Sequence, residues 1–296
     1  MRYQSVQKHY HMMLFPGVVL LFIFTIIPMF GVLIAFQDFK IGLGIWKSPW
    51  VGLENFVYLF QLSDSKRIFI NTLVLSIAKI VGNLIIPLVF AILLNELRKQ
   101  KFKRTVQTIV YLPHFLSWVI LSSVISDLLL LNGPVNGLIK WFGFEPIMFM
   151  TSNQWFPVIV IFSDVWKEFG FNAIIYLAAL AGVNPSLYEA AEMDGAARLR
   201  QIWHITLPAL RPTIVLLATL SIGNILNAGF DQILNLYNPL VYESGDVIDT
   251  FVYRAGILDG QYGLATAVGL LKSFIAFILI ITSYKLAGRF ANYRIF

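Results

Sequence analysis

The residues best suited to chemistry are ionisable side chains that interrupt apolar stretches of this chain. Asp164, Lys167 and Glu168 stand at positions i, i+3 and i+4, so a helix would place all three on one face, where they could neutralise one another. Ionisable groups in an apolar medium are costly, and they either pair or face a polar cavity. We favour a structural ion pair between helices over direct contact with a solute.

Other polar side chains raise the same question. Lys79 and Lys272 each interrupt a different apolar stretch, and a lysine that faced a cavity would offset the charge of an acidic solute. Asn224, Asn227 and Asp231 recur at near-helical spacing, which would place them on roughly one face of a helix. Such a polar stripe either hydrogen-bonds to a neighbouring helix or lines a cavity, and the sequence leaves both interpretations open.

Patterns that carry catalysis are missing from the sequence. The phosphate-binding pattern G-x4-G-K-[ST] is absent, because Gly269–Ser273 lacks the first glycine, and neither H-E-x-x-H nor G-x-S-x-G occurs. The histidines are scattered, at positions His9, His11, His114 and His204. Without cysteine the chain can form neither thiolate metal sites nor disulfides. We therefore assign no catalytic residue, metal or cofactor to this chain.

The composition indicates a membrane protein. The chain has 296 residues, of which 58% are hydrophobic and 13% charged, and its mean hydropathy is +0.74. Average soluble domains are about half apolar and about a quarter charged. Most of this surface must therefore face lipid. The first apolar run, Met12–Phe36, is longer than a signal-peptide core of roughly 7–15 residues, so we expect a spanning helix there.

Six segments are predicted to span the bilayer, since a spanning helix needs about 20 mostly apolar residues. They are Met13–Phe36, Phe69–Leu94, Val106–Leu131, Phe156–Gly182, Pro212–Phe230 and Gly263–Leu286. No repeat or linker divides the chain, so we expect a single transmembrane domain over residues 1–296. The stretch between the first two spans, Gln37–Arg67, contains Trp, Pro and Gly residues that indicate an ordered external loop.

The distribution of Lys and Arg predicts that both termini lie in the cytoplasm. With that orientation, thirteen basic residues fall in cytoplasmic segments, Arg294 among them, and six fall in external loops. Basic residues concentrate on the cytoplasmic side of membrane proteins. The net charge of +6 is accounted for in this way, and it requires no nucleic acid as a partner.

The predicted cytoplasmic loop over about residues 184–208 has a distinctive local pattern. Asn184-Pro185 is expected to end the preceding helix, because a residue before proline avoids the α region. Ser186, followed three residues later by Glu189, has the spacing of a capping box, which predicts a short helix from Leu187 to about Met193. Asp194-Gly195 should stop that helix, since glycine allows the backbone a sharp turn.

A second short helix is predicted after this turn, from about Ala196 to Ile205. Pro208 is expected to end it, and Pro212 is expected to begin the next span. The turn between the two helices carries small side chains, which allow another surface to approach closely. They are Ala190, Ala191, Gly195, Ala196 and Ala197. An exposed helix–turn–helix of this kind is suited to docking into a partner's groove.

This loop resembles a known signature. The pattern E-A-A-x3-G-x9-I-x-L-P is typical of permease subunits of ATP-binding-cassette importers, and the chain matches it without departures. The residues that the resemblance assigns to coupling with an ATPase are Glu189, Ala190, Ala191, Asp194, Gly195, Ala196, Ile205, Leu207 and Pro208. In that family the loop forms a coupling helix that inserts into a cleft of the cytoplasmic ATPase. A simpler alternative role for Glu189 is that of a helix cap.

The resemblance covers nearly the whole chain. Trp50–Phe56, Asp164–Ala191 and the terminal Tyr293–Phe296 are similar to segments of sugar-importer permeases, above all those that import oligosaccharides such as alginate or pectin fragments. It implies the six-helix fold of type I importer permeases. Trp118 and Trp166 could then stack on sugar rings, although tryptophan in a membrane helix is more often simply packed.

The resemblance also implies partners. They are a second, homologous permease, two ATPase subunits that bind ATP and magnesium, an extracytoplasmic solute-binding protein, and membrane lipid. An ion-coupled secondary transporter of sugars is the alternative, and it would need discontinuous helices and ion ligands. A membrane enzyme is disfavoured because the sequence lacks a catalytic cluster.

Overall fold

The computed structural model describes residues 2–291 of the chain. The segment Tyr293–Phe296, with the Arg294 counted above, lies outside the described residues. The described part is mainly helical, and the β contact found in it is an isolated antiparallel bridge between Gln37 and Trp50. The predicted all-α class is confirmed.

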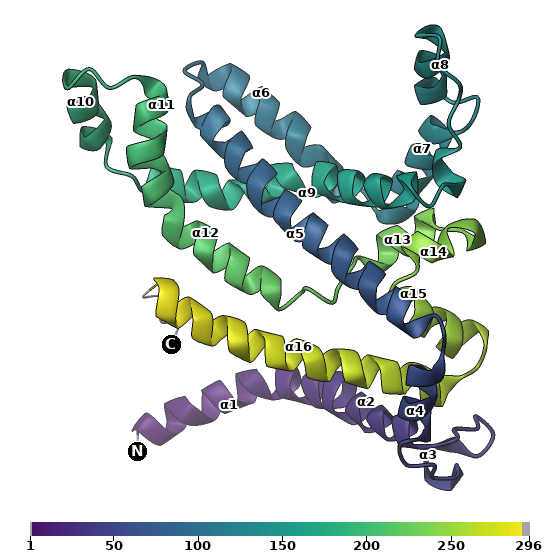
Figure 1. The fold of residues 1–296 in the computed structure, drawn as a ribbon. Helices are drawn as coiled ribbons and strands as arrows, with labels where there is room; N and C mark the ends of the chain where they lie inside the picture. The colour runs from purple at the N-terminus through teal and green to yellow at the C-terminus, as the bar shows by residue number, and fades with distance from the viewer. Residues whose placement is uncertain (1, 292–296) are drawn as a thin grey trace. The chain divides into compact units, whose positions relative to one another are not determined.

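Two compact units make up the chain. One comprises the residues up to Ser65 together with Phe251–Leu271, and the other comprises Lys66–Thr250 together with the residues from Lys272 onward. The last helix, α16 (Tyr262–Ala291), is drawn in yellow in Figure 1; its residues up to Leu271 belong to the first unit and those from Lys272 to the second.

The first unit begins with a long helical segment whose turns change width near Pro28. Because proline has no N–H to donate, a π-helical turn precedes it and a 3-10 helix follows. Its elements are α1 (Arg2–Leu21), η1 (Phe22–Ile26), α2 (Ile27–Met29), η2 (Phe30–Phe36), α3 (Gly44–Lys47), α4 (Glu54–Gln61) and η7 (Arg254–Leu258).

The loop after this segment is ordered, as predicted. The Val51 N–H donates to the Phe36 carbonyl and the Asp38 N–H donates to the Pro49 carbonyl, each at 2.9 Å. The Asn55 side chain reaches back to the carbonyl oxygen of Ala35 at 2.9 Å. These contacts close the loop on the end of the first helical segment.

The second unit is built on two long helices, α5 (Ser65–Asn95) and α9 (Trp155–Ala181). Its other elements are α6 (Gln100–Tyr111), η3 (Leu112–Phe115), α7 (Trp118–Leu129), α8 (Pro134–Trp141), η4 (Phe149–Thr151), α10 (Pro185–Met193), α11 (Arg198–Gln201), η5 (Ile202–Thr206), α12 (Leu207–Ile222), α13 (Phe230–Leu236), η6 (Pro239–Val241), α14 (Tyr242–Gly245) and α15 (Ile248–Tyr253).

Two apolar clusters hold this unit together. One joins α5, α9 and α13 through residues such as Leu75, Val160 and Ile233, and the other joins α5, α9 and α12 through residues such as Tyr176 and Leu210. Helices within a membrane pack chiefly through close van der Waals contact and hydrogen bonds, because lipid is as apolar as these side chains. α5 and α9 contribute to both clusters, so the rest of the unit packs on these two helices.

Five described segments are long and apolar enough to cross a membrane. They are Tyr10–Phe36, Ser65–Asn95, Trp118–Trp141, Arg198–Ile222 and Tyr262–Lys285. α9 is also long, at 27 residues, but Asp164, Lys167 and Glu168 interrupt its apolar run. The count of six spans and the orientation of both termini toward the cytoplasm stay predictions.

Two predicted spans are wrong in their boundaries. The predicted Val106–Leu131 span is broken: Pro113 lies in a 3-10 turn, and Ser117 is extended and accepts the Ile120 N–H as the N-cap of α7. The predicted Pro212–Phe230 span ends early, because α12 stops at Ile222 and residues 223–229 form a connection. Gly229, in a left-handed conformation with φ of 90°, ends that connection.

Candidate functional site

The short helix α10 begins earlier than its sequence pattern predicted. Asn184 is the N-cap, its side chain accepts the Ser186 N–H at 3.1 Å, and Pro185 occupies the first helical position. The predicted capping box of Ser186 and Glu189 is therefore wrong as the start of the helix. Asn is among the best N-cap residues and Pro is preferred at the first position, so this pair prevails.

The end of α10 is as predicted. Gly195 adopts a φ of 73° after Asp194. The Ala196 N–H donates to the Ala191 carbonyl at 2.8 Å, and the Gly195 N–H donates to the Glu192 carbonyl at 3.0 Å. This is the Schellman arrangement, in which a left-handed residue lets two last carbonyls of a helix find donors.

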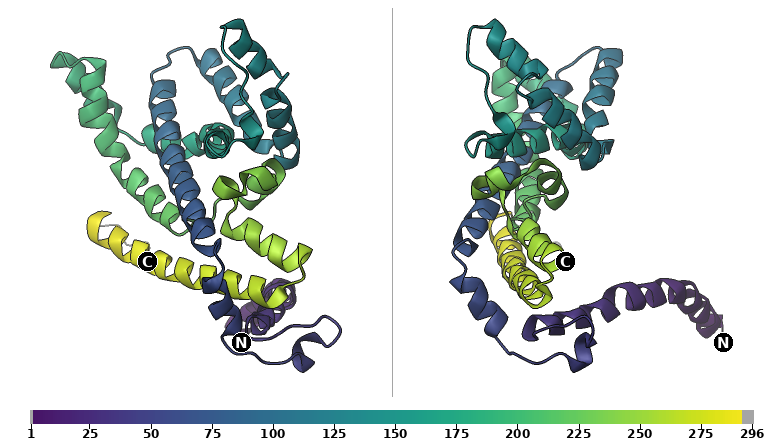
Figure 2. Two further views of the ribbon diagram at one scale, coloured as in Figure 1. Left: turned by 45° about the vertical axis from the view of Figure 1, so that its right-hand side comes forward. Right: turned by 90° about the vertical axis from the view of Figure 1, so that its right-hand side faces the viewer.

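The segment after the turn differs from the prediction. Instead of a second short helix that ends at Pro208, α11, η5 and α12 form one helix from Arg198 to Ile222, 25 residues long. The π-helical turn η5 precedes Pro208, so the Leu207 N–H bonds five residues back, to Ile202. This wider turn accommodates a residue without an N–H. The chain runs along α10, turns at Gly195 and returns through α11 into α12 (Figures 1 and 2).

Polar contacts tie α10 to this long helix. The Tyr188 hydroxyl lies 3.0 Å from the Thr206 hydroxyl, and the Arg198 guanidinium lies 2.9 Å from the Glu192 carboxylate. The Gln201 side-chain amide donates to the Ala196 carbonyl at 3.0 Å. The first two contacts connect α10 to η5 and α11, and the third holds the turn after α10 against α11, so α10 is linked to the helix that leads to Ile222.

The outward surface of this loop combines small and apolar residues with carboxylates. Of the residues predicted to couple, five are exposed: Glu189, Ala190, Asp194, Gly195 and Pro208. The other four are half-buried: Ala191, Ala196, Ile205 and Leu207. Large apolar side chains around them are also exposed, and Met193 on α10 reaches 88%. We call Leu187, Ala190 and Met193 on α10 the α10 face. An apolar face that is exposed next to polar residues is typical of a docking surface.

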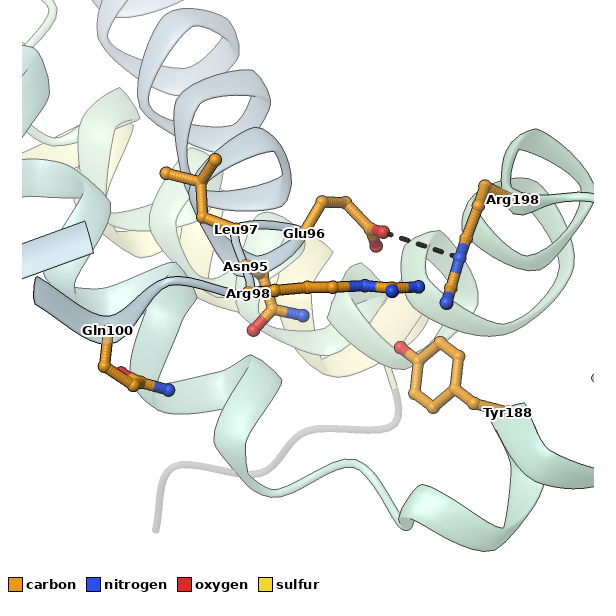
Figure 3. A pocket seen from close by; sticks show the side chains of 7 residues that line it. All are labelled: Asn95, Glu96, Leu97, Arg98, Gln100, Tyr188 and Arg198. Carbon is orange, nitrogen blue, oxygen red and sulfur yellow. Dashed lines mark ion pairs between the residues drawn. The ribbon is translucent and has the colours of Figure 1, made fainter. Parts of the chain in front are cut away.

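A recess lies between α10 and the turn that joins α5 to α6 (Figure 3). Its volume is about 300 Å³, and it is lined by Asn95, Glu96, Leu97, Arg98, Gln100, Tyr188 and Arg198. Figure 3 shows Arg98 extended toward Arg198, whose guanidinium lies 4.0 Å from the Glu96 carboxylate. Arg198 thus contacts carboxylates on α10 and beyond the end of α5, so it links α10 to a third part of the unit.

The ionisable residues of α9 are paired: Asp164 takes part in an ion pair between helices, the interpretation that we favoured, and Lys167 and Glu168 neutralise each other within α9. Asp164 pairs with Lys79 of α5 at 3.4 Å rather than with Lys167. Lys167 is buried, pairs with Glu168 at 3.0 Å and donates to the His114 carbonyl at 2.8 Å.

Glu168 has a further partner, His114, which the sequence did not predict. Its ring nitrogen lies 2.7 Å from the Glu168 carboxylate, and its ring stacks on Phe171 with centroids 3.9 Å apart. The two residues are 54 positions apart, so no spacing in the sequence could have revealed the contact. Lys272 of α16 similarly pairs with Asp249 in the first turn of α15, with both side chains about one-fifth exposed.

The predicted helical stripe of Asn224, Asn227 and Asp231 is wrong. Asn224 and Asn227 lie in the connection between α12 and α13, and Asp231 lies in the first turn of α13. All three are nonetheless exposed. Trp166 of α9 is 41% exposed, whereas Trp118 is half-buried, with its ring 5.5 Å from the Lys167 ammonium. No group of metal-ligating side chains occurs among the described residues.

Comparisons with known proteins agree with this geometry. Residues 83–292 match the family described as binding-protein-dependent transport system inner membrane component. The polygalacturonan/rhamnogalacturonan transport system permease protein YteP of Bacillus subtilis is 44% identical over 98% of this chain and 91% of its own length.

Two crystal structures contain a similar chain. One is a bacterial ABC transporter involved in the import of the acidic polysaccharide alginate, with a TM-score of 0.90 and 37% identity over 97% of this chain and 98% of that one. The other is a bacterial alginate ABC transporter in complex with an alginate pentasaccharide-bound periplasmic protein, with a TM-score of 0.89 and 36% identity over 98% of both chains. The chain therefore belongs to the family of binding-protein-dependent transport system inner membrane components, as a multi-pass permease of an ABC importer.

Proposed function

We propose that this permease imports an oligosaccharide, of which acidic fragments of pectin or alginate are the favoured class. The observation that carries the proposal is the hairpin formed by α10 and the start of the Arg198–Ile222 helix, which we call the docking hairpin. It has an exposed apolar face on α10 and a Schellman turn between the two helices. The names of the similar proteins supply the substrate class. YteP is a polygalacturonan/rhamnogalacturonan permease, and the transporter of similar structure imports alginate.

The α10 face is proposed to dock into a cleft of a cytoplasmic ATPase subunit. Two such subunits would bind ATP and magnesium, because the sequence of this chain has no phosphate-binding loop. ATP hydrolysis would then belong to the partners, and the chain would not itself be an enzyme. Gly195 and the alanines Ala190, Ala191 and Ala196 would act through shape, by allowing close approach in two states of the complex.

The long helix from Arg198 to Ile222 is proposed to transmit this docking to the solute path. At 1.5 Å per residue its 25 residues span about 37 Å, enough to cross the apolar part of a bilayer. ATP binding would draw the two docking hairpins together and open the cavity outward, and hydrolysis would return it inward. A second, homologous permease would enclose the path, and an extracytoplasmic binding protein would deliver the oligosaccharide.

The path residues proposed from sequence divide into two groups. Asn224, Asn227, Asp231 and Trp166 expose polar or flat surface that a sugar can use. Lys167 and Lys272 are engaged by Glu168 and Asp249, so their role in offsetting the charge of a uronic acid would pass through those pairs. We further propose six spans, both termini in the cytoplasm, and one transmembrane domain with a docking loop over about 184–208.

The test is reconstitution from the native membrane. The tagged chain should co-purify with an ATPase and a second permease, and ATP hydrolysis in proteoliposomes should rise when a binding protein loaded with oligogalacturonate or oligoalginate is added. Orthovanadate, which traps the ATPase, should abolish uptake, and a protonophore should not. Co-purification without an ATPase, or uptake that only the protonophore abolishes, would contradict the proposal.

A broken helix is also a feature of ion-coupled secondary transporters. The connection between α12 and α13 therefore agrees with that alternative in one respect. Family membership, established over 98% of the chain, outweighs it, because such transporters have no use for an ATPase-docking hairpin.

A further inference from the structure

The connection between α12 and α13 interrupts the α-helical hydrogen bonds next to a spanning helix: its first residues form turns with bonds three residues back, and residues 227–229 have no regular structure. Its side chains alternate in environment: Leu226 and Ala228 are buried, whereas Asn224 and Asn227 are exposed. Non-helical backbone at membrane depth persists only where protein buries it or a water-filled cavity receives it. The buried side of this connection must therefore be satisfied by the protein.

Lys79 of α5 supplies a hydrogen-bond donor to the buried side of this connection. This lysine is only 5% exposed, and its ammonium donates to the Ala228 carbonyl at 2.6 Å. It also donates to the side-chain carbonyl of Gln232 in α13, and it lies 3.4 Å from the Asp164 carboxylate of α9. A Cβ added to Gly229 would lie 3.0 Å from the ammonium, so the left-handed glycine is what lets the cation come this close.

A second set of contacts fixes the groups around the ammonium. The Asn83 amide donates to the other Asp164 oxygen at 2.9 Å. The Gln232 amide donates to the Val160 carbonyl at 2.7 Å and to the Ser163 hydroxyl at 2.8 Å. α5, α9 and α13 thus converge on one buried charge. Asn83 orients the Asp164 carboxylate, and Val160 and Ser163 orient the Gln232 side chain, toward the Lys79 ammonium.

We propose that Lys79 and Asp164 are positioning residues for the solute path. Their pair holds the Ala228–Gly229 backbone inward, which turns Asn227 and Asp231 outward, where they can bond to a passing hydroxyl-rich solute. The inference rests on the proposed function, since it needs a solute path at this connection. It differs from a purely stabilising ion pair in one consequence: removing both charges together should still misplace the connection.

That consequence defines the key variant, Lys79→Met with Asp164→Asn. The double variant leaves no unpaired buried charge, and Asn at 164 can still accept from Asn83, but nothing replaces the donor to Ala228. We expect normal insertion and complex assembly, with the KM for transport raised about tenfold and the maximal rate changed less than about threefold. Lys79→Arg, made with Asp164 retained, keeps a cationic donor, so its KM should be close to that of the natural chain. A double variant with the KM of the natural chain would overturn the inference.

The absence of cysteine from this chain allows a direct readout. Asn227→Cys, alone and in the double variant, would be labelled in the purified complex with a hydrophilic maleimide, and labelling of this chain would be followed by mass. Glu145→Cys, at an exposed site in another loop, is the control. We expect the labelling rate at position 227 to fall at least about threefold in the double variant, by loss of its outward placement, and the rate at 145 to stay unchanged.

The outcomes separate the inference from the function on which it rests. Equal labelling at 227 in both backgrounds overturns the inference, and so does altered labelling with an unchanged KM, because the connection would then lie off the path. If the complex of the natural chain shows no substrate-stimulated ATP hydrolysis, the proposed function fails instead. The labelling result still reports on whether Lys79 holds the connection.

Discussion

The two ends of the helix from Arg198 to Ile222 differ in how far their polar groups are exposed to solvent. At the α10 end, the Arg198–Glu192 ion pair has both side chains about half exposed, and apolar side chains such as Met193 are left exposed. At the other end, the Lys79 ammonium is buried and surrounded by acceptors from α9, α13 and the connection. The exposed α10 end is suited to binding another protein, and the buried end at Lys79 is suited to holding one fixed backbone geometry.

The same difference determines how each end should respond to mutation. A buried ion pair costs much to break because the remaining charge has no partner, whereas an exposed contact costs little because water replaces it. Changes at the buried end should therefore appear first in stability. Changes at the α10 end should appear in coupling to the ATPase while the fold is retained.

The largest expected effect comes from Asp164→Asn alone. It leaves the buried Lys79 ammonium without its carboxylate, which should lower the free energy of unfolding by about 3–5 kcal/mol. Thermal unfolding of the purified chain in detergent measures it. Asp38→Asn, which breaks a pair with Lys40 in which both side chains are more than half exposed, is the matched control and should cost less than about 1 kcal/mol. Equal losses would mean that the Lys79–Asp164 pair costs no more to break than an exposed pair, which would contradict the expectation for the buried end.

Gly195→Asp should have the next largest effect, on coupling rather than on stability. A side chain at φ of 73° strains the Schellman turn, and its charge enters the proposed docking surface. We expect substrate-stimulated ATP hydrolysis to fall more than about tenfold, or about 1.4 kcal/mol, with insertion intact. Gly143→Asp imposes similar backbone strain, at φ of 84° with no atom near the added Cβ, away from α10. Loss of activity in both variants would point to strain alone.

Met193→Ala probes the apolar part of the α10 face. Burial of a methionine side chain at an interface contributes roughly 1.5–3 kcal/mol, so its truncation should weaken binding of the ATPase subunit about tenfold. Titration of the purified ATPase onto the permease in nanodiscs measures this affinity. Met148→Ala, at a methionine 65% exposed in a different loop, should leave the affinity unchanged. An unchanged affinity in Met193→Ala would place the docking contact elsewhere.

Tyr188→Phe should have the smallest effect. It removes the hydroxyl that lies 3.0 Å from Thr206, a hydrogen bond that contributes about 0.5–1.5 kcal/mol. We expect stimulated ATP hydrolysis to fall about twofold to fivefold, because α10 loses one of its links to the long helix. Tyr58→Phe, at an exposed tyrosine of the first unit, is the control. A decrease as large as that of Gly195→Asp would mean that this bond, rather than the docking face, limits coupling.

Much of the fold follows from local patterns. The long apolar runs predicted helices where α5, α9 and α16 occur, because spanning a bilayer requires about 20 apolar residues whatever their neighbours are. The turn at Gly195 was also predictable, since only its own backbone and the preceding four residues are involved. The start of α10 at Asn184-Pro185 could have been read in the same way, from a better ranking of N-cap residues.

Elements whose ends depend on distant residues were not predictable. The break after Ile222 opposes the hydropathy pattern. The continuity through Pro208 opposes the proline rule, but its cause is local, the π-helical turn η5. The break persists because Lys79, about 150 positions away, takes the carbonyl that a longer helix would have satisfied. Hydropathy averages over neighbours in the chain, so it cannot register a single buried donor contributed by another helix.

By itself, then, the sequence determined that this chain is a membrane permease with a docking hairpin, because those properties arise from composition and from spacings of a few residues. Only the tertiary structure decided which charges pair: Lys79 with Asp164, Lys167 with Glu168, and Lys272 with Asp249. Two of these pairs join residues far apart in the chain, and a carboxylate pairs with whichever ammonium the packing of helices brings within reach. That choice therefore depends on how the helices pack, which the spacing of residues in the sequence does not specify.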